Sequence, residues 1–378
     1  MIYLDNAATT RTAPEVVEAM LPYFSEYFGN AGSIYGLGSR SKKALIMARE
    51  VIAGTLGAQA NEIYFTAGGT ESDNWAFKAV YESCRGQSCH MITSKVEHHA
   101  VLHTCKYLEG HGARITYLDV DKDGMIDLEQ LKKAIRPDTV LISVMCANNE
   151  IGTIEPLQEI GEIAREHGIL FHTDAVQAYG HLPIDVNKLS IDLLSASGHK
   201  FNGPKGSGFL YVNSGTKLMP LIHGGKQERG RRAGTENIPG IVGMSAAAER
   251  AVSRMHAKAE AESRMRDYLI RNIEEKIPGA VLTGHRTMRL PGHVSFCFEG
   301  IEGESALIML DMQGICASSG SACTSGDPGP SHVLLATGIS QEMAKGSLRF
   351  TLSEENTMEE LDTTVEVLAE VVGKLRGL

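Results

Sequence analysis

The sequence predicts an α/β protein in which a large domain with a mostly parallel sheet is joined to a smaller α+β domain. Three observations support this class. Apolar, strand-like segments alternate with helical patterns through the middle of the chain. Residues 239–277 then contain almost no helix breaker, and residues 294–298 alternate as a strand does. We expect residues 15–254 to form the large domain, and residues 1–14 and 255–378 to form the small one.

The large domain is expected to contain several buried strands followed by turn or helix signals. These strands are residues 62–66, 115–118, 140–145, 169–172, 192–196 and 208–212. Asp127 is expected to cap a helix that starts at Leu128. Another helix is expected to have Pro156 in its first turn and to end at Gly168, with its apolar residues on one face.

The small domain is expected to follow one long helix, or two joined helices, over residues 239–277. Residues 294–298 are interpreted as a half-exposed strand. Ser353 is a candidate cap for a C-terminal helix whose apolar stripe consists of Leu361, Val365, Leu368, Val372 and Leu375.

Composition excludes several classes of protein. The 378 residues are 43% hydrophobic and 22% charged, as in ordinary globular proteins, and the net charge of −10 argues against direct nucleic-acid binding. No apolar run reaches the length that a membrane helix needs, and no signal-peptide pattern is seen. The seven cysteines are odd in number and irregularly spaced. We therefore expect a reduced, cytoplasmic protein that does not bind membranes.

Two charged residues follow predicted strands, where ligands of parallel sheets are bound. Lys200 lies in the segment Ser197-Gly198-His199-Lys200, and a desolvated lysine there is suited to Schiff-base chemistry. Asp174 comes 26 residues earlier and is suited to pair with a protonated pyridine nitrogen. The alternatives are a solvated lysine in a glycine-rich turn and an aspartate that caps a helix.

Three further segments are candidates for ligand binding. Residues 68–72, GGTES, follow a predicted strand and form a possible phosphate cradle, although such turns are common. His98, with His99, His103 and Cys105, matches no zinc spacing, so a ring-stacking or helix-start histidine is favoured over a metal ligand. Residues 119–130 resemble a calcium loop but have Gln130 at the twelfth position, which favours an acidic turn. We predict no metal.

Cys323 lies among small residues, in SGSACTSGDPGP, whereas a structural cysteine normally has large apolar neighbours, as Cys297 has. An accessible thiol on a mobile loop suits nucleophilic or redox chemistry. The alternative is a spectator surface cysteine.

The order of these motifs resembles that of the cysteine desulfurases, class-V enzymes of aminotransferase fold type I that use pyridoxal phosphate (PLP). The resemblance covers essentially the whole chain. It rests on residues 5–10 (DNAATT), 68–72 (GGTES), 97–98 (EH), 148–152 (NNEIG), 174–177 (DAVQ), 197–200 (SGHK), 231–235 (RRAGT) and 319–323 (SGSAC).

The resemblance implies roles for individual residues. Lys200 would hold PLP covalently and act as a base, Asp174 would pair with the ring nitrogen, and His98 would stack on the ring. Gln177 and Asn149 would contact the side of the ring that carries the hydroxyl. The phosphate would be bound by Gly69, Thr70, Ser197 and His199, and by Thr235 of a second subunit, which implies a homodimer. Arg349 and Asn30 would hold the substrate carboxylate; Ala31-Gly32-Ser33 departs from the family's usual Pro-Ser after that asparagine.

The implied reaction converts L-cysteine into L-alanine and a persulfide on Cys323, which passes its sulfur to an acceptor such as an iron–sulfur scaffold protein. About 3% of an ordinary thiol is ionised at pH 7, so Cys323 is expected to lose its proton on entering the site. The alternatives are an aminotransferase or lyase on the same PLP frame, which the Cys323 loop disfavours, and a catalytically silent interaction protein, which the intact Lys200, Asp174, His98 and Cys323 disfavour.

Overall fold

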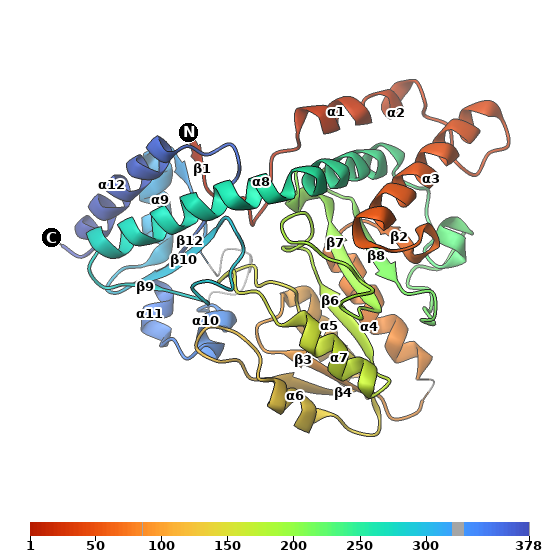
Figure 1. The fold of residues 1–378 in the computed structure, drawn as a ribbon, viewed down its shortest axis with the longest axis horizontal. Coiled ribbons are helices and arrows are strands. Elements are labelled where there is room, and N and C mark those ends of the chain that lie inside the picture. Colours follow the sequence, from red (N-terminus) through yellow and green to blue (C-terminus); the bar gives the residue numbers. More distant parts are fainter. Residues whose placement is uncertain (85, 320–328, 378) are drawn as a thin grey trace.

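The computed structural model describes residues 1–84, 86–319 and 329–377. A seven-stranded sheet in the order β2-β8-β7-β6-β5-β3-β4 lies at the centre of the larger part (Figure 1). Its strands are β2 (Ile63–Thr66), β3 (His90–Ser94), β4 (Arg114–Leu118), β5 (Thr139–Ser143), β6 (Leu170–Asp174), β7 (Leu193–Ser197) and β8 (Gly208–Val212).

The sheet is mostly parallel, as the sequence predicts. Strands β4, β3, β5, β6 and β7 pair in parallel, and only β8 runs against its neighbours β7 and β2. All six predicted strands are present to within a few residues. The additional strand, β3, has the sequence HMITS, which carries no clear strand pattern. It is fully buried because β4 and β5 pair with its two edges.

Helices cover both faces of this sheet, so alternate strand residues enter two different cores. Met91 and Leu141 pack with helices α4 (Gly69–Ser83) and α5 (His99–Glu109), whereas Ile92 and Ile142 pack with α3 (Gly36–Leu56) and α7 (Leu157–Glu166). Helix α6 (Leu128–Ala134) begins at the predicted cap, where Asp127 accepts a hydrogen bond from the backbone of Glu129. The short helices α1 (Pro14–Met20) and α2 (Pro22–Ser25) precede α3.

Helix α8 (Ile238–Lys276) joins the two parts of the molecule as one continuous helix (Figure 1). Its 39 residues extend over about 58 Å at the usual helical rise. Its first half contacts α3 and α1, and its second half contacts β9 (Ala280–Leu282), β10 (His293–Phe298) and α12 (Met358–Leu375). Residue 254 lies inside this helix, and the domain boundary there stays a prediction.

The smaller part contains the sheet β12-β10-β9, in which β12 is Ser347–Thr351. Helix α9 (Gly303–Met312) packs with it, and α10 (His332–Ala336) and α11 (Gln341–Lys345) lie beside the larger part. The N-terminal strand β1 (Ile2–Tyr3) pairs in parallel with β11 (Ile315–Cys316). Both chain ends therefore lie on the side of the smaller part (Figure 1).

Two expectations for this part are wrong. Strand β10 is buried along its whole length instead of half-exposed, because Phe296 packs into the smaller core while Cys297 packs against Val96 and Ile151 of the larger part. Helix α12 is capped by Thr357 and not by Ser353. Thr357 forms a reciprocal capping box with Glu360, with hydrogen bonds of 3.2 and 3.1 Å.

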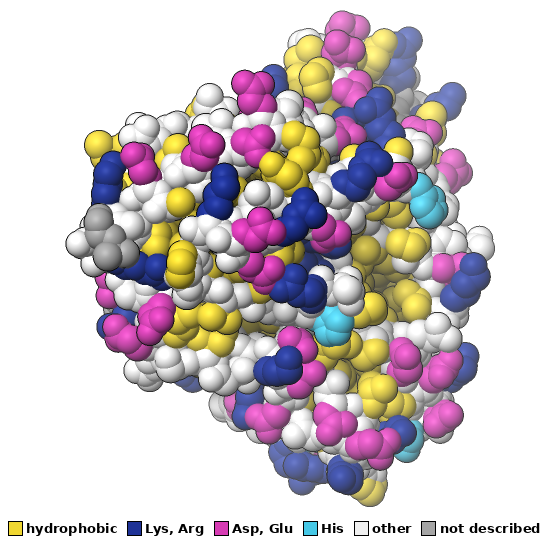
Figure 2. Space-filling model, turned by 60° about the vertical axis from the view of Figure 1, so that its left-hand side comes forward, with side chains coloured by type: hydrophobic (Ala, Val, Ile, Leu, Met, Phe, Trp, Pro, Cys, Tyr) yellow, Lys and Arg dark blue, Asp and Glu magenta, His cyan; other side chains and the backbone are white. Residues whose placement is uncertain are grey.

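The surface carries acidic and basic side chains interspersed with apolar ones, as one face shows in Figure 2. In the described part of the chain, no helix has the length and apolar character needed to cross a membrane.

Candidate active site

A cavity of about 280 Å³ opens where the parallel strands of the large sheet end. Strand β6 ends at Asp174, and β7 ends at Ser197 just before the 3₁₀ turn Gly198–Lys200. This is the edge at which ligands of α/β sheets are bound. The lining residues are Ala7, Gly69, Thr70, Asp73, His98, Met145, Asn149, Asp174, Val176, Gln177, Ser197, His199 and Lys200.

Lys200 is held from two sides. Its ammonium group donates hydrogen bonds to the carbonyl oxygens of Ala7 (2.5 Å) and Ala8 (3.0 Å). Its own carbonyl oxygen accepts a 3.0 Å hydrogen bond from Nε2 of the half-buried His181. The N-terminal segment, 193 and 192 positions away in sequence at these two contacts, therefore sets where the amine lies.

Asp174 is buried at the wall of the cavity, and its Oδ1 accepts a 2.8 Å hydrogen bond from the backbone of Val176. Burial raises the pKa of Asp174 to about 6, while the Val176 N–H and the charge of Lys200 oppose that rise. The segment after Asp174 forms turns and not a helix, so the helix-cap alternative is wrong. A buried carboxylate of this kind is suited to bind a protonated ring nitrogen.

The start of helix α4 forms the opposite wall. A side chain at Gly69 would collide with Val176, so only glycine lets the helix start approach the segment after Asp174 this closely. Gly69, Thr70, Ser197 and His199 also line a neighbouring hollow with Lys205. Backbone N–H groups at a helix start, three hydrogen-bonding side chains and a lysine are suited to a phosphate.

His98 caps helix α5, where its Nδ1 accepts a 3.1 Å hydrogen bond from the backbone of Ala100. Burial, reinforced by the charge of Lys200, lowers the pKa of His98 to about 4, so its ring is neutral and carries its proton on Nε2. The rings of His99 and His103 lie 4.8 Å apart. Among residues 1–84, 86–319 and 329–377, no group of three potential ligands is arranged to hold a metal.

The cavity contains nine of the ten residues expected to bind the cofactor, and Thr235 is the tenth. The residues expected to bind the substrate, Asn30 and Arg349, do not line it. Thr235 is exposed outside the cavity, and Asn30 is exposed, with its Oδ1 bonded to the backbone of Gly32. Arg349 is buried behind Asn149, where it donates to the Asn149 carbonyl (2.7 Å) and pairs with Asp5 (2.9 Å). Cys323 lies outside the described residues.

Sequence reasoning missed four lining residues: Ala7, Asp73, Met145 and Val176. Ala7 and Val176 lie within motifs that carry the family resemblance, and Asp73 directly follows one. Their proximity to the cavity was therefore foreseeable, but their contacts were not, because these contacts join segments far apart in the chain.

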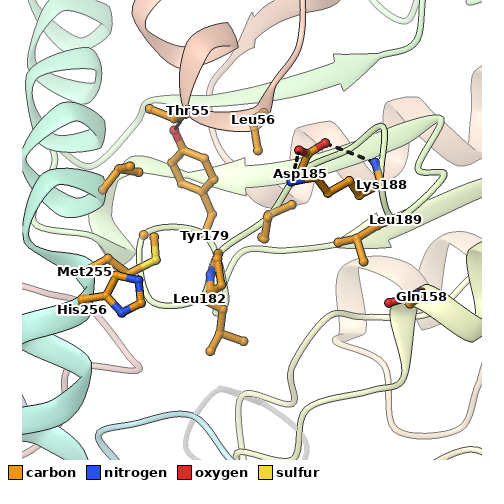
Figure 3. Close-up of a pocket in the computed structure, with 14 residues that line it drawn as sticks. Thr55, Leu56, Gln158, Tyr179, Leu182, Asp185, Lys188, Leu189, Met255 and His256 are labelled. Atoms are coloured by element: carbon orange, nitrogen blue, oxygen red, sulfur yellow. Dashed lines mark hydrogen bonds and ion pairs between the residues drawn. The ribbon is translucent and has the colours of Figure 1, made fainter.

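A second cavity, of about 450 Å³, lies beside α8 and is shown in Figure 3. Met255 and His256 enter it from α8, and Tyr179 bonds Thr55 at 2.6 Å. The other face of Tyr179 packs on Phe201, the residue after Lys200, with ring centroids 5.0 Å apart. The aromatic wall of this cavity therefore supports the lysine segment from behind.

The comparisons with known proteins agree with this geometry. The family profile described as "Aminotransferase class-V" matches residues 2–364. "Cysteine desulfurase IscS" of Methanosarcina thermophila is 57% identical over 100% of this chain and 93% of its own length. Among solved structures, "NIFS-LIKE PROTEIN" superposes with a TM-score of 0.93 at 38% identity, covering 99% of both chains. "SspA in complex with cysteine" has a TM-score of 0.83 at 39% identity, covering 94% of this chain and all of its own.

A doubly covered parallel sheet with a lysine, a carboxylate and an anion cradle at its strand ends defines a PLP-dependent enzyme of fold type I. The residues fit that cofactor: Asp174, the start of α4 and Lys200 line one cavity and are suited to bind its ring nitrogen, phosphate and aldehyde. This chain belongs to the class-V aminotransferase family and, within it, to the cysteine desulfurases.

Proposed function

We propose that this enzyme removes sulfur from L-cysteine, releases L-alanine and passes the sulfur through a persulfide on Cys323 to an acceptor protein. The observation that carries the proposal is the single cavity in which Lys200, Asp174 and His98 meet. The full-length similarity to cysteine desulfurases supports the choice of substrate. PLP, when bound, supplies an electron sink that acidifies the substrate α-carbon.

Lys200 is proposed to hold the cofactor through Nζ and then to move the substrate's α-proton. The carbonyl oxygens of Ala7 and Ala8 hold that nitrogen at the cavity wall. The neutral His98 ring, with its proton on Nε2, is suited to stack on the cofactor and to donate that proton. Asp174 is proposed to keep the ring nitrogen protonated, and Gln177 and Asn149 to contact the hydroxyl side of the ring.

The phosphate is proposed to lie at the start of α4, against Gly69, Thr70, Ser197 and His199. Burial and the nearby lysines lower the pKa of His199 to about 4, so it acts as a neutral hydrogen-bonding group. Arg349 is proposed to receive the substrate carboxylate with Asn30. For this role the Arg349 guanidinium, which pairs with Asp5, must share or exchange that partner.

The remaining cysteines support Cys323 as the sulfur carrier. Burial raises the pKa values of Cys89, Cys105, Cys146 and Cys297, those of the last two to about 12, and so keeps these thiols protonated. Cys84 ends α4, about 22 Å of helix away from Gly69 at its start.

The sulfur transfer balances without an outside oxidant. The Cys323 thiolate forms a bond to the substrate sulfur while the substrate's C–S bond breaks. The electron pair of that bond remains on the β-carbon, which takes up a proton to become the methyl group of alanine. The enzyme retains a persulfide, and an acceptor thiol can attack it.

Incubation with L-cysteine tests this reaction directly. We expect L-alanine and enzyme persulfide in equal amounts in one turnover without a reductant, and catalytic sulfide release once a thiol reductant is added. An aminotransferase would instead form the keto acid and leave the cofactor as its amine. Keto acid as the main product, or no reaction by enzyme that carries PLP, would contradict the proposal.

A homodimer is proposed, because two observations fit a subunit interface. The segment 21–35, which includes α2, exposes the large apolar side chains Leu21, Phe24, Phe28, Ile34 and Tyr35, with Phe28 68% exposed. Thr235 is exposed and lies outside the cavity, as expected of a residue that completes the site of a second subunit.

Mixing two defective variants tests the composite site. When Thr235→Ala and Lys200→Ala subunits exchange, each mixed dimer should contain one site with both native residues. Desulfurase activity should therefore rise above the sum of the separate variants. A mixture no more active than that sum, or a fully active monomer by light scattering, would exclude the shared site.

The acceptor is proposed to be a protein thiol, such as one on an iron–sulfur scaffold protein, and the enzyme is proposed to act in the cytoplasm. The expected reduced state of its cysteines supports this location, and the charge of −10 supports protein acceptors over direct contact with nucleic acid.

A further inference from the structure

A second carboxyl group faces the proposed cofactor cavity. Asp73, in the second turn of α4, lines the cavity together with Asp174 and is 1% exposed. Its Oδ1 has no hydrogen-bond partner among the residues that the structure describes. A buried polar atom of this kind is costly, so it is expected to find a partner in the loaded enzyme.

The histidine that lies next to Asp73 does not provide a positive charge to balance an ionised carboxylate. The nearest ring nitrogen, Nε2 of His172, lies 3.7 Å from Oδ1. His172 is itself enclosed by Ser143 (2.8 Å from Nδ1) and Ser195 (3.1 Å from Nε2). Complete burial lowers the pKa of His172 to about 3, so the ring is neutral and cannot balance a carboxylate.

Besides the neutral His172, two acidic groups on neighbouring elements act electrostatically on Asp73. They are Asp174, at the end of β6, and Glu97, in the segment between β3 and α5. Burial is the main cause that raises the pKa of Asp73 well above its usual range, and repulsion from Asp174 and Glu97 adds to it, while a hydrogen bond from Ser195 opposes it. Before the cofactor is bound, the charge of Lys200 favours the ionised form of Asp174.

Two buried carboxyl groups that line one cavity and act on each other electrostatically are not both ionised, because like charges in a medium of low polarity repel strongly. We propose that Asp73 stays a neutral carboxylic acid in the holoenzyme and donates a hydrogen bond to the Asp174 carboxylate. The ring nitrogen then meets a single negative charge, which is fixed in place by a second acid. Asp73 is thus a positioning residue that acts through Asp174, and this inference rests on the proposed role of Asp174.

Infrared spectroscopy of the PLP-loaded enzyme tests the charge of Asp73 directly. The difference spectrum between the parent and Asp73→Asn should show loss of the carbonyl stretch of a protonated carboxylic acid, a band that shifts in D₂O. Asparagine has nearly the same shape and is a neutral donor, so the rest of the spectrum should change little. Loss of ionised carboxylate bands, with no protonated band, would overturn the proposal.

Cofactor binding separates the neutral donor from a merely structural side chain. Apoenzymes of the parent, Asp73→Asn and Asp73→Leu are titrated with PLP, and the visible band of each complex is followed against pH. Asp73→Asn should bind PLP close to the parent affinity, whereas Asp73→Leu, which lacks a donor, should bind about tenfold more weakly. Equal weakening in both variants, or parental binding by Asp73→Leu, would contradict the proposal.

Two controls keep these outcomes distinct. Thermal unfolding of each apoenzyme reports whether Asp73→Leu folds, and the infrared measurement decides the question if it does not. Asp174→Asn should lose PLP affinity and shift the visible band by itself. Parental behaviour of Asp174→Asn would refute the proposed role of Asp174, whatever the charge of Asp73.

Discussion

Replacement of Cys323 by serine is expected to abolish alanine formation from L-cysteine while leaving PLP in place. A serine hydroxyl has the size of the thiol but is a far weaker nucleophile at neutral pH, so turnover should fall roughly 10³-fold or more. The visible spectrum should remain that of the parent, because the cavity residues that we propose to hold PLP are unchanged. Alanine and sulfide are measured together, and the cofactor band is recorded in the same samples.

Cys316→Ser is the matched control. Cys316 lies in strand β11, paired with Tyr3, and is half-buried. We expect this variant to desulfurate cysteine at close to the parental rate. Peptide mapping after one turnover without acceptor should find the persulfide on Cys323. Persulfide on Cys316, or near-parental turnover by Cys323→Ser, would show that another thiol carries the sulfur.

Lys200→Ala is expected to remove the covalent attachment of PLP and to lower turnover by about 10²–10⁴-fold, the usual contribution of a positioned acid–base group. The amine is held by the carbonyl oxygens of Ala7 and Ala8, and alanine cannot replace either its bond to PLP or its proton transfer. Borohydride reduction followed by peptide mapping measures the attachment independently of activity.

Lys205→Ala controls for the second lysine of this region, which lines the neighbouring hollow and not the main cavity. The reduced PLP adduct should remain on Lys200 in this variant. An adduct found on Lys205 in the parent enzyme would transfer the proposed role from Lys200 to Lys205.

Much of the fold could be predicted because its signals are local. The apolar strands and the helix start at Leu128 were located to within a few residues, since each depends on periodicity or a cap within one segment. Local patterns gave the wrong burial where a second segment of the chain covers a surface that they predict to be exposed. Strand β10 alternates like a half-exposed strand, yet its outer face is covered by Val96 and Ile151.

The same division applies to the candidate site. The sequence by itself determined the family and the ends of strands β6 and β7. It therefore also indicated that Asp174, Ser197 and Lys200 lie near one another, because the ends of parallel strands meet at one edge of the sheet. Only the tertiary structure decided that Ala7 holds the Lys200 amine, that Arg349 pairs with Asp5, and that Asp73 enters the cavity. The reason is physical: hydrogen bonding and burial depend on which segments fold against one another, and residues far apart in the chain carry no local pattern that records their contact.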